Sequence, residues 1–251
     1  MKPTNDHPST EETLYGIHTV KEALGARPID YVLVAEGHHS PRVEEIIQLC
    51  RARGVSLRFV PRQALDRITG SAHHQNVAAA CAARGYEDLD AVASASDRLL
   101  LIALDEVEDP ANLGAVIRTA VAAGAHGAII PERRAAGLSG AVARAASGAL
   151  EHLKVARVTN LARALGELKR KQIWVYGFEA RAEKSYLDLD YSAPCVLVLG
   201  GEGRGLRRLV RETCDSLAAI PLAGPVESLN VSVAAAIVLY EAARQRRGLN
   251  A

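Results

Sequence analysis

The sequence has few aromatic side chains and no long apolar run, and each shortage excludes a class of protein. Phe, Trp and Tyr make up 4% of the 251 residues, so a broad aromatic platform for stacking nucleic-acid bases is not expected. No apolar run approaches the roughly 20 residues of a membrane-spanning helix. The polar N-terminus also lacks the basic and apolar regions of a signal peptide. We therefore expect a cytoplasmic chain with no membrane contact.

Cysteine is also sparse. The four cysteines, Cys50, Cys81, Cys195 and Cys214, are scattered and include no C-x-x-C pair, which indicates reduced thiols in a cytoplasm rather than a disulfide framework or a zinc site. The adjacent His73 and His74 have no Cys or carboxylate partner at ligand spacing. We expect no metal.

The formal charge of +1 conceals an asymmetry between the two halves of the chain. Residues 1–97 carry 10 Lys/Arg against 13 Asp/Glu, whereas residues 98–251 carry 20 against 16. Neither half is strongly basic, so charge alone does not indicate a nucleic-acid partner. Any phosphate-binding surface must be local.

Apolar runs and helical patterns divide the chain into two α/β parts. In the first, we expect helices at 15–24, 41–53 and 61–68 and strands at 31–35, 56–60 and 76–81. From residue 98 onward, apolar strands alternate with helices in a regular way, which predicts a mostly parallel sheet covered on both faces. The predicted division is a disordered tail at 1–12, a small α/β domain at 13–83, a linker at 84–97 and a larger domain at 98–251.

Three loop sequences in the second part each follow an apolar run that is typical of a buried strand. The first is Asp109-Pro-Ala-Asn-Leu-Gly114, in which Pro110 fixes a turn and Asn112 can cap the next helix. Arg118 lies six residues after Asn112, in a stretch otherwise rich in Ala, Val, Ile and Leu. We expect the two near one helical face, with Arg118 either in a buried ion pair or acting as a functional cation.

The second loop, Gly200-Gly-Glu-Gly-Arg-Gly205, contains more glycine than a tight strand-to-helix turn needs, which predicts a close approach to its backbone. It does not match the dinucleotide fingerprint, because Leu206 stands where the third glycine would be. Four arginines follow at i, i+3, i+4 and i+7, which predicts one stripe on a helix: Arg204, Arg207, Arg208 and Arg211. The stripe is either a solvated face or a contact for RNA phosphates.

The third loop begins at Ile220-Pro-Leu and ends at Ser228-Leu-Asn-Val-Ser232, ahead of a long helix rich in alanine. Ser228 is a plausible N-cap for that helix, and Asn230 could support the turn. The alanines allow another helix to approach closely, which fits either a subunit interface or a buried core helix. Three loops at strand ends in one half of a chain indicate a ligand crevice.

In their order and their residues, the three loops resemble the signature motifs of the SPOUT methyltransferases, in the SpoU/TrmH branch that methylates the ribose 2′-hydroxyl of RNA. The first half, with Tyr15-Gly-Ile-His18 and His74-Gln75, resembles the substrate-binding domain of the bacterial 23S rRNA guanosine 2′-O-methyltransferases. The resemblance covers almost the whole chain, except for about the first twelve residues. It implies an α/β fold with a parallel sheet and a C-terminal trefoil knot, preceded by a small RNA-binding α/β domain, in a homodimer.

The resemblance also implies S-adenosylmethionine as methyl donor, held by Gly200, Ile220 and Leu229. By motif matching, the family's functional residues fall on Asn112, Arg118, Glu202, Ser228 and Asn230. Arg118 would bind a phosphate and stabilise the developing alkoxide, or else accept the proton.

The implied substrate is a guanosine ribose in the peptidyl-transferase P loop of 23S rRNA, free or within a pre-ribosomal large subunit. The alternatives are tRNA or another rRNA ribose and, from a different class, a non-catalytic ribosome-assembly factor. Glu106 and Glu108 make the approach to the first motif more acidic than the family pattern suggests.

Overall fold

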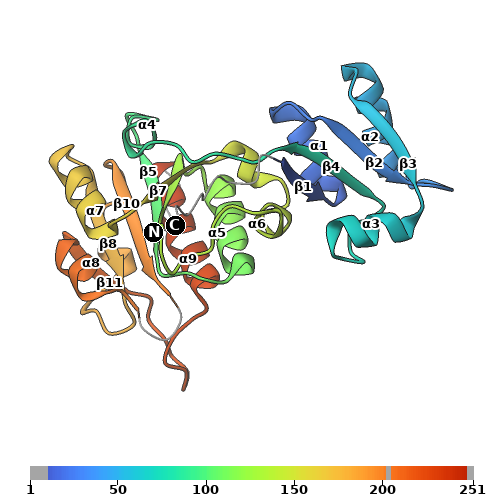
Figure 1. Ribbon diagram of the computed structural model, residues 1–251. Helices are drawn as coiled ribbons and strands as arrows, with labels where there is room; N and C mark the ends of the chain where they lie inside the picture. The colour runs from blue at the N-terminus through green and yellow to red at the C-terminus, as the bar shows by residue number, and fades with distance from the viewer. Residues whose placement is uncertain (1–10, 202–204, 248–251) are drawn as a thin grey trace, which may run out of the picture. The chain divides into compact units, whose positions relative to one another are not determined.

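The computed structural model describes residues 11–201 and 205–247, so most of the predicted tail at 1–12 lies outside the described residues. The chain forms two compact units, shown in Figure 1. The first contains the residues up to Gly85 together with Leu138–Glu151, and the second contains Tyr86–Gly137 and the residues from His152 onward.

The first unit has a four-stranded sheet with the order β1-β4-β2-β3, in which β2 and β3 are parallel and the other neighbours antiparallel. Its strands are β1 (Glu11–Tyr15), β2 (Tyr31–Ala35), β3 (Ser56–Val60) and β4 (Val77–Ala82), and its first three helices are α1 (Ile17–Ala26), α2 (Pro41–Arg53) and α3 (Arg62–Thr69). Leu65 of α3 is fully buried and packs with Tyr15, Leu33 and Ala78. The sequence pattern missed β1, because this edge strand begins with two glutamates and only its last two residues are buried.

The second unit has a seven-stranded sheet with the order β7-β6-β5-β10-β8-β11-β9, and every neighbouring pair in it is parallel. The strands are β5 (Leu100–Asp105), β6 (Gly127–Pro131), β7 (Lys154–Val158), β8 (Trp174–Phe178), β9 (Lys184–Ser185), β10 (Cys195–Gly200) and β11 (Ser216–Ala219). The predicted parallel sheet is confirmed. The two-residue strand β9 was not predicted, since it is too short to leave an apolar pattern.

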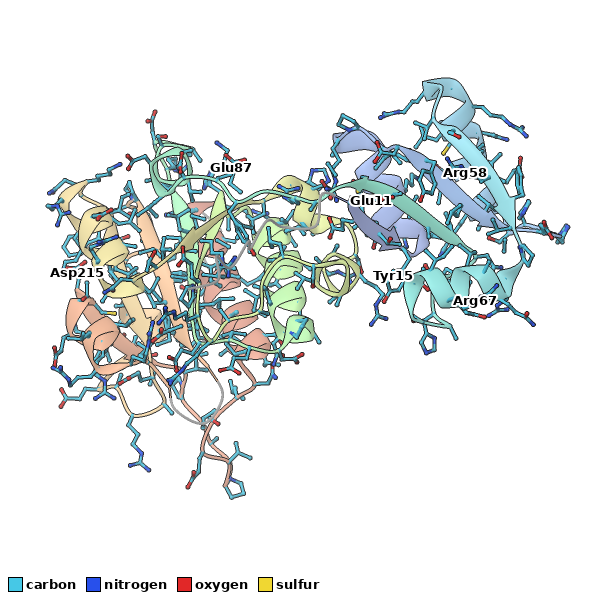
Figure 2. The ribbon with its side chains drawn as sticks, in the orientation of Figure 1. Glu11, Tyr15, Arg58, Arg67, Glu87 and Asp215 are labelled. Atoms are coloured by element: carbon cyan, nitrogen blue, oxygen red, sulfur yellow. The ribbon has the colours of Figure 1, made fainter. Side chains whose placement is uncertain are left out.

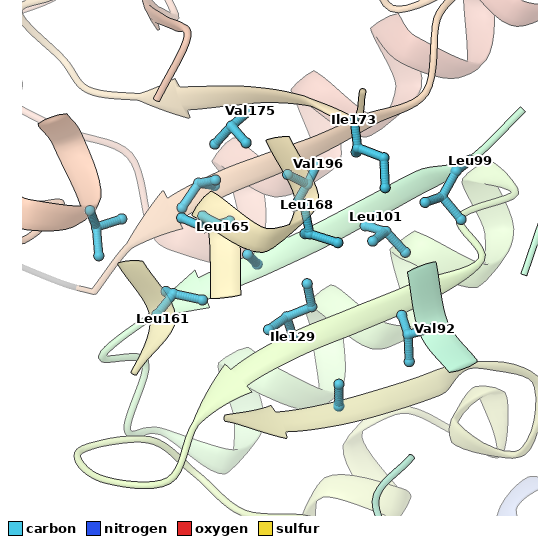
Figure 3. Packing of buried hydrophobic residues seen from close by; sticks show 14 of the residues in the cluster. Val92, Leu99, Leu101, Ile129, Leu161, Leu165, Leu168, Ile173, Val175 and Val196 are labelled. Carbon is cyan, nitrogen blue, oxygen red and sulfur yellow. The ribbon is translucent and has the colours of Figure 1, made fainter. Parts of the chain in front are cut away.

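Helices cover both faces of this sheet. They are α4 (Leu89–Ala93), α5 (Pro110–Ala123), α7 (Leu161–Arg170), α8 (Arg208–Thr213) and α9 (Val231–Arg246). Figure 1 shows α7 and α8 on one face and α5 with α9 on the other. On the first face, Leu161, Leu165 and Leu168 of α7 lie at helical spacing and pack on Val175 and other buried strand residues, as Figure 3 shows.

The segment predicted as a linker, 84–97, packs almost entirely with the second unit. Glu87 forms a parallel bridge with Ala156 of β7, and Val92 of α4 is fully buried in the core. One bridge and one short helix give no repeating apolar pattern, so the sequence did not reveal this packing.

The segment between β6 and β7 was predicted as a helix of the larger domain, but residues 138–151 pack with the first unit. This segment forms α6 (Gly140–Ala145) and the start of a 3₁₀ turn (Ala149–His152). A Cβ on Gly140 would lie 2.7 Å from the Thr13 carbonyl oxygen, so only glycine allows this approach. Glu151 is nearly buried and forms ion pairs with Arg84 (2.9 Å) and Arg27 (3.3 Å). The trefoil knot stays a prediction.

Candidate functional site

The three motif loops lie at the carboxyl ends of parallel strands of the second unit. The first follows β5, which ends at Asp105, the second follows β10, and the third follows β11. Since β5 pairs with β10, and β8 alone separates β10 from β11, the three strand ends lie close together at one edge. Ligands of open α/β sheets bind outside this edge. The sheet therefore gathers the motifs where the sequence predicted a crevice.

An ion pair with a buried carboxylate links the end of β5 to the start of α8. The Asp105 side chain is fully buried and accepts hydrogen bonds from the backbone N–H of Arg207 (2.8 Å) and its Nε (2.7 Å). Another guanidinium nitrogen of Arg207 lies 2.6 Å from Asp105 Oδ1, and these hydrogen bonds raise the pKa of Arg207. Asp105 was not among the predicted site residues, although a carboxylate at the end of an apolar strand was a signal present in the sequence.

Two glycines of the second loop, Gly200 and Gly201, allow close contacts within the chain. A Cβ on Gly200 would lie 2.1 Å from the Gly205 carbonyl carbon, and one on Gly201 would lie 2.2 Å from the Glu106 carbonyl oxygen. Glu106 has a left-handed backbone with φ of 60°. The sequence predicted that something approaches this backbone closely. At least part of that approach is made by the backbone of Glu106 and Gly205.

Two asparagines join the first and third loops. Asn230 Nδ2 donates a hydrogen bond of 3.1 Å to Asn112 Oδ1, across 118 positions of sequence. The predicted helix caps were wrong. Asp109, with its side chain bonded to Ala111 N–H, caps α5, and Asn230 caps α9 by accepting from Ser232 N–H at 2.9 Å. Asn112 therefore does not cap α5, and Ser228 is exposed and precedes α9.

Arg118 is exposed on α5, which excludes the buried ion pair that was one of its two predicted settings. A helix turns about 100° per residue, so six residues place Arg118 about 120° around α5 from Asn112. The expectation of one shared face was wrong. Arg118 lies about 9 Å further along the helix axis, on a side of α5 that solvent reaches.

The predicted four-arginine stripe does not form as one helical face. The helix begins at Arg208, after an extended Arg207 at its N-cap, so only Arg208 and Arg211 lie on α8. Carboxylates of the protein compensate the described arginines: Arg207 pairs with Asp105, Arg208 with Glu212 at 2.8 Å, and Arg211 with Glu179 at 2.9 Å. RNA is not needed to offset their repulsion. Arg204 lies outside the described residues.

The residues predicted to hold the cofactor lie at the same edge. Gly200 ends β10, Ile220 directly follows β11, and Leu229 directly precedes the N-cap of α9; all three are partly buried. They offer backbone polar groups and aliphatic side chains, which suit an adenine ring and its edges. Glu202 lies outside the described residues.

Two further observations bear on the chemistry of the described residues. Burial raises the pKa of the Cys195 thiol to about 11 and that of Cys214 to about 12, so neither is a ready nucleophile. Among residues 11–201 and 205–247, no group of three or more His, Cys, Asp or Glu is arranged to hold a metal ion. No helix in those ranges is long and apolar enough to cross a membrane.

Comparison with protein families assigns both parts of the chain. Residues 99–240 match the model of the SpoU rRNA Methylase family, and residues 13–87 match the model described as RNA 2′-O ribose methyltransferase substrate binding. The chain belongs to the SpoU rRNA methylase family. The predicted resemblance is thus confirmed.

Two relatives are similar over nearly their whole length. The chain is 46% identical to the 23S rRNA (guanosine-2′-O-)-methyltransferase RlmB of Xylella fastidiosa, over 93% of this chain and 96% of that protein. It is 45% identical to the putative TrmH family tRNA/rRNA methyltransferase YacO of Bacillus subtilis, over 92% and 94%.

A solved structure with its cofactor shares the fold of this SpoU family member. The SpoU methyltransferase AviRb of Streptomyces viridochromogenes, crystallised with AdoMet, superposes with a TM-score of 0.81 at 26% identity, over 95% of this chain and 92% of that one. Gly200, Ile220 and Leu229, as described above, fit the same cofactor by their chemistry.

Proposed function

We propose that this protein transfers a methyl group from S-adenosylmethionine to the ribose 2′-hydroxyl of a guanosine in 23S rRNA, at the peptidyl-transferase P loop. The observation that supports this most directly is the hydrogen bond between Asn112 and Asn230, because it joins the first and third family motifs into one site. The relatives' names supply the substrate: RlmB proteins that are 42–46% identical are called 23S rRNA guanosine-2′-O-methyltransferases.

We assign a separate role to each set of motif residues. When bound, S-adenosylmethionine supplies a methyl group that is already activated by its sulfonium. Gly200, Ile220 and Leu229 hold the adenosine part, and Asn112, Glu202, Ser228 and Asn230 orient the cofactor and the ribose. Arg118 binds the adjacent RNA phosphate and stabilises the charge that develops on the 2′-oxygen. A guanidinium is a poor base, so proton acceptance by Arg118 is the less favoured role.

Mass spectrometry of modified rRNA tests this proposal. Purified protein is incubated with labelled S-adenosylmethionine and 23S rRNA that lacks 2′-O-methyl groups, and the methylated riboses are mapped. We expect one 2′-O-methylguanosine in the P loop. Label in tRNA alone would retain the chemistry and replace the target. Cofactor binding without any methylation would favour the alternative, a non-catalytic ribosome-assembly factor that binds rRNA in the cytoplasm.

We further propose that the protein is a homodimer through the outer face of α9. Val233 is 48% exposed and Tyr240 is 55% exposed, and the partly buried Ile237 lies between them at helical spacing. Large apolar side chains aligned on an exposed helix are typical of a covered surface.

Light scattering after gel filtration is expected to give about twice the chain mass of 26.7 kDa. A double change, Val233→Arg with Tyr240→Arg, should shift the protein to the monomer mass, because two buried charges per subunit would oppose association. Ile68→Arg, at an apolar residue of the first unit that is 49% exposed, is the matched control and should leave the dimer intact. A dimeric double variant would contradict the proposed interface.

A further inference from the structure

The residue that follows β5, Glu106, has a backbone shape that glutamate seldom adopts. Its φ is 60°, in the left-handed region where a Cβ is unfavourable and glycine is the usual residue. Glu106 lies at the carboxyl edge of the sheet, between the buried Asp105 and the buried Val107. Non-glycine residues in this region collect at functional sites, where the surrounding structure holds them. A glutamate at this position therefore needs a physical reason beyond the turn that it makes.

The backbone of Glu106 is packed against the second loop. A Cβ on Gly201 would lie 2.2 Å from the Glu106 carbonyl oxygen, so the two backbones are in direct contact. Gly201 N–H also donates to the Asp105 carbonyl at 2.7 Å. The Val107 carbonyl accepts from the N–H of Ala136, in the loop that follows β6, at 2.8 Å. These contacts explain the left-handed turn, but they use only backbone atoms, and glycine would make them more easily.

The carboxylate of Glu106 lies between two guanidinium groups. Its Oε1 is 3.5 Å from Nη1 of Arg134, in the loop after β6, and 3.6 Å from Nη1 of Arg207. The Glu106 side chain is 14% exposed, whereas those of Arg134 and Arg207 are 64% and 44% exposed. Arg207 already has a closer carboxylate in Asp105, at 2.6 Å. Loose ion pairs with exposed partners contribute little to stability, so folding alone gives no strong reason for a glutamate here.

Glu106 makes the carboxylates and guanidiniums that meet here equal in number. Asp105 and Glu106 are negative, and Arg134 and Arg207 are positive, so the group of four is neutral. We name these four residues the β5 charge cluster. Without Glu106, the cluster would carry a net positive charge beside the second loop, whose Gly200 is assigned to the cofactor. S-adenosylmethionine is itself positive at its sulfonium, and like charges in a partly enclosed site repel each other.

We propose that Glu106 is a positioning residue that lets the second loop accept a cationic cofactor, by offsetting the charge of Arg134 and Arg207. This inference rests on the proposed function for the place of the cofactor at Gly200. Methyl transfer returns the S–CH₃ bonding pair to sulfur, so the product, S-adenosylhomocysteine, is a neutral thioether at that atom. The Glu106 carboxylate therefore favours the methyl donor over the spent product.

Another partly enclosed carboxylate of the same unit has a structural explanation. Asp215, labelled in Figure 2, precedes β11 and so lies at the opposite, amino edge of the parallel sheet. Its side chain is 20% exposed, accepts from Val175 N–H at 2.8 Å and pairs with Lys169 at 2.9 Å. Asp215 therefore matches Glu106 in charge and approximately in burial, but it lies away from the three motif loops.

Isothermal titration calorimetry with S-adenosylmethionine and S-adenosylhomocysteine tests the proposal on the full chain. The deciding quantity is the Kd for S-adenosylhomocysteine divided by the Kd for S-adenosylmethionine, because a general loosening of the loop would weaken both ligands alike and leave this ratio unchanged. Glu106→Gln should lower the ratio about five-fold, since it removes one charge and keeps the size of the side chain. Glu106→Gly should lower the ratio to the same extent without lowering the melting temperature, because glycine adopts the left-handed backbone freely.

A second change tests whether charge or structure is responsible. Adding Arg134→Ala to Glu106→Gln makes the cluster neutral again, so the ratio should return to within about two-fold of its value in the unaltered protein. A structural defect would not be repaired by a second loss. Two matched controls should keep the ratio: Glu108→Gln removes an exposed charge from the same loop, and Asp215→Asn removes one at the opposite edge of the sheet.

Equal weakening of both ligands by Glu106→Gln, or no change for either, would overturn the proposal, as would an equal fall of the ratio in Glu108→Gln. Methylation of 23S rRNA is measured in parallel. A protein that shows the expected ratios but methylates no RNA fails only the proposed function. One that methylates rRNA while Glu106→Gln leaves the ratio unaltered fails only this inference.

Discussion

Arg118→Ala is expected to lower the rate of methyl transfer by about 10²–10³-fold, the range seen when a preorganised charge-stabilising donor is removed. The side chain is exposed on α5, so the change should leave the melting temperature unaltered. The affinity for S-adenosylmethionine should also stay the same, because Gly200, Ile220 and Leu229, which hold its adenosine part, lie on the second and third loops. Single-turnover rates and cofactor titration measure the two effects separately.

Arg118→Lys separates the proposed role from a general need for positive charge. Lysine keeps the charge but loses the planar donor pair that binds a phosphate at two points, so we expect only partial recovery. Arg170→Ala, at an exposed arginine that ends α7, is the matched control and should retain full activity. If Arg118→Lys turned over at nearly the normal rate, both phosphate binding and proton acceptance by Arg118 would be contradicted.

The second large effect is expected at Arg207, and it is an effect on stability. Arg207→Ala would leave the buried Asp105 carboxylate without its guanidinium; because that guanidinium is itself 44% exposed, we expect a cost of about 1–3 kcal/mol. For a protein of this size, that corresponds to a fall in melting temperature of roughly 2–12 °C. Because Arg207 follows the glycine loop, KM for S-adenosylmethionine should rise as well.

A comparison with Arg208 distinguishes this role from RNA contact. Arg208 pairs with Glu212 in an exposed i, i+4 pair, so Arg208→Ala should change stability by less than about 1 kcal/mol. Double replacement of Asp105 and Arg207 by Asn and Gln should restore part of the lost stability, since no buried charge remains. If Arg207→Ala weakened RNA binding but melted normally, the arginine would be an RNA contact and the ion pair unimportant.

The sequence was sufficient to predict the parallel sheet and the position of the site. The runs at 99–104 and 195–200 are continuously apolar, as strands buried on both faces must be, and β5 and β10 are indeed neighbours. Once the strands are parallel, the loops that follow them have to share an edge. The shared position of the three motifs could therefore be predicted without knowing any side-chain contact.

The side-chain pairings at that edge could not be predicted in the same way. Asp109, Asn112, Ser228 and Asn230 are all capable of capping a helix, and local sequence does not decide among them. The contact between Asn112 and Asn230 spans 118 residues, and that between Asp105 and Arg207 spans 102. Periodicity describes which face of an element is buried, but it carries no information about which distant partner a polar group meets.

The placement of residues 138–151 with the first unit has a consequence for how the protein can be divided. The polypeptide passes from one unit to the other three times, after Gly85, Gly137 and Glu151. A fragment ending at Gly85 would lack α6, which covers β1, and Arg27 and Arg84 would lose Glu151. A fragment starting at Tyr86 would retain α6 without its packing partners. A fragment that preserves the packing of the substrate-binding part must therefore include residues 138–151.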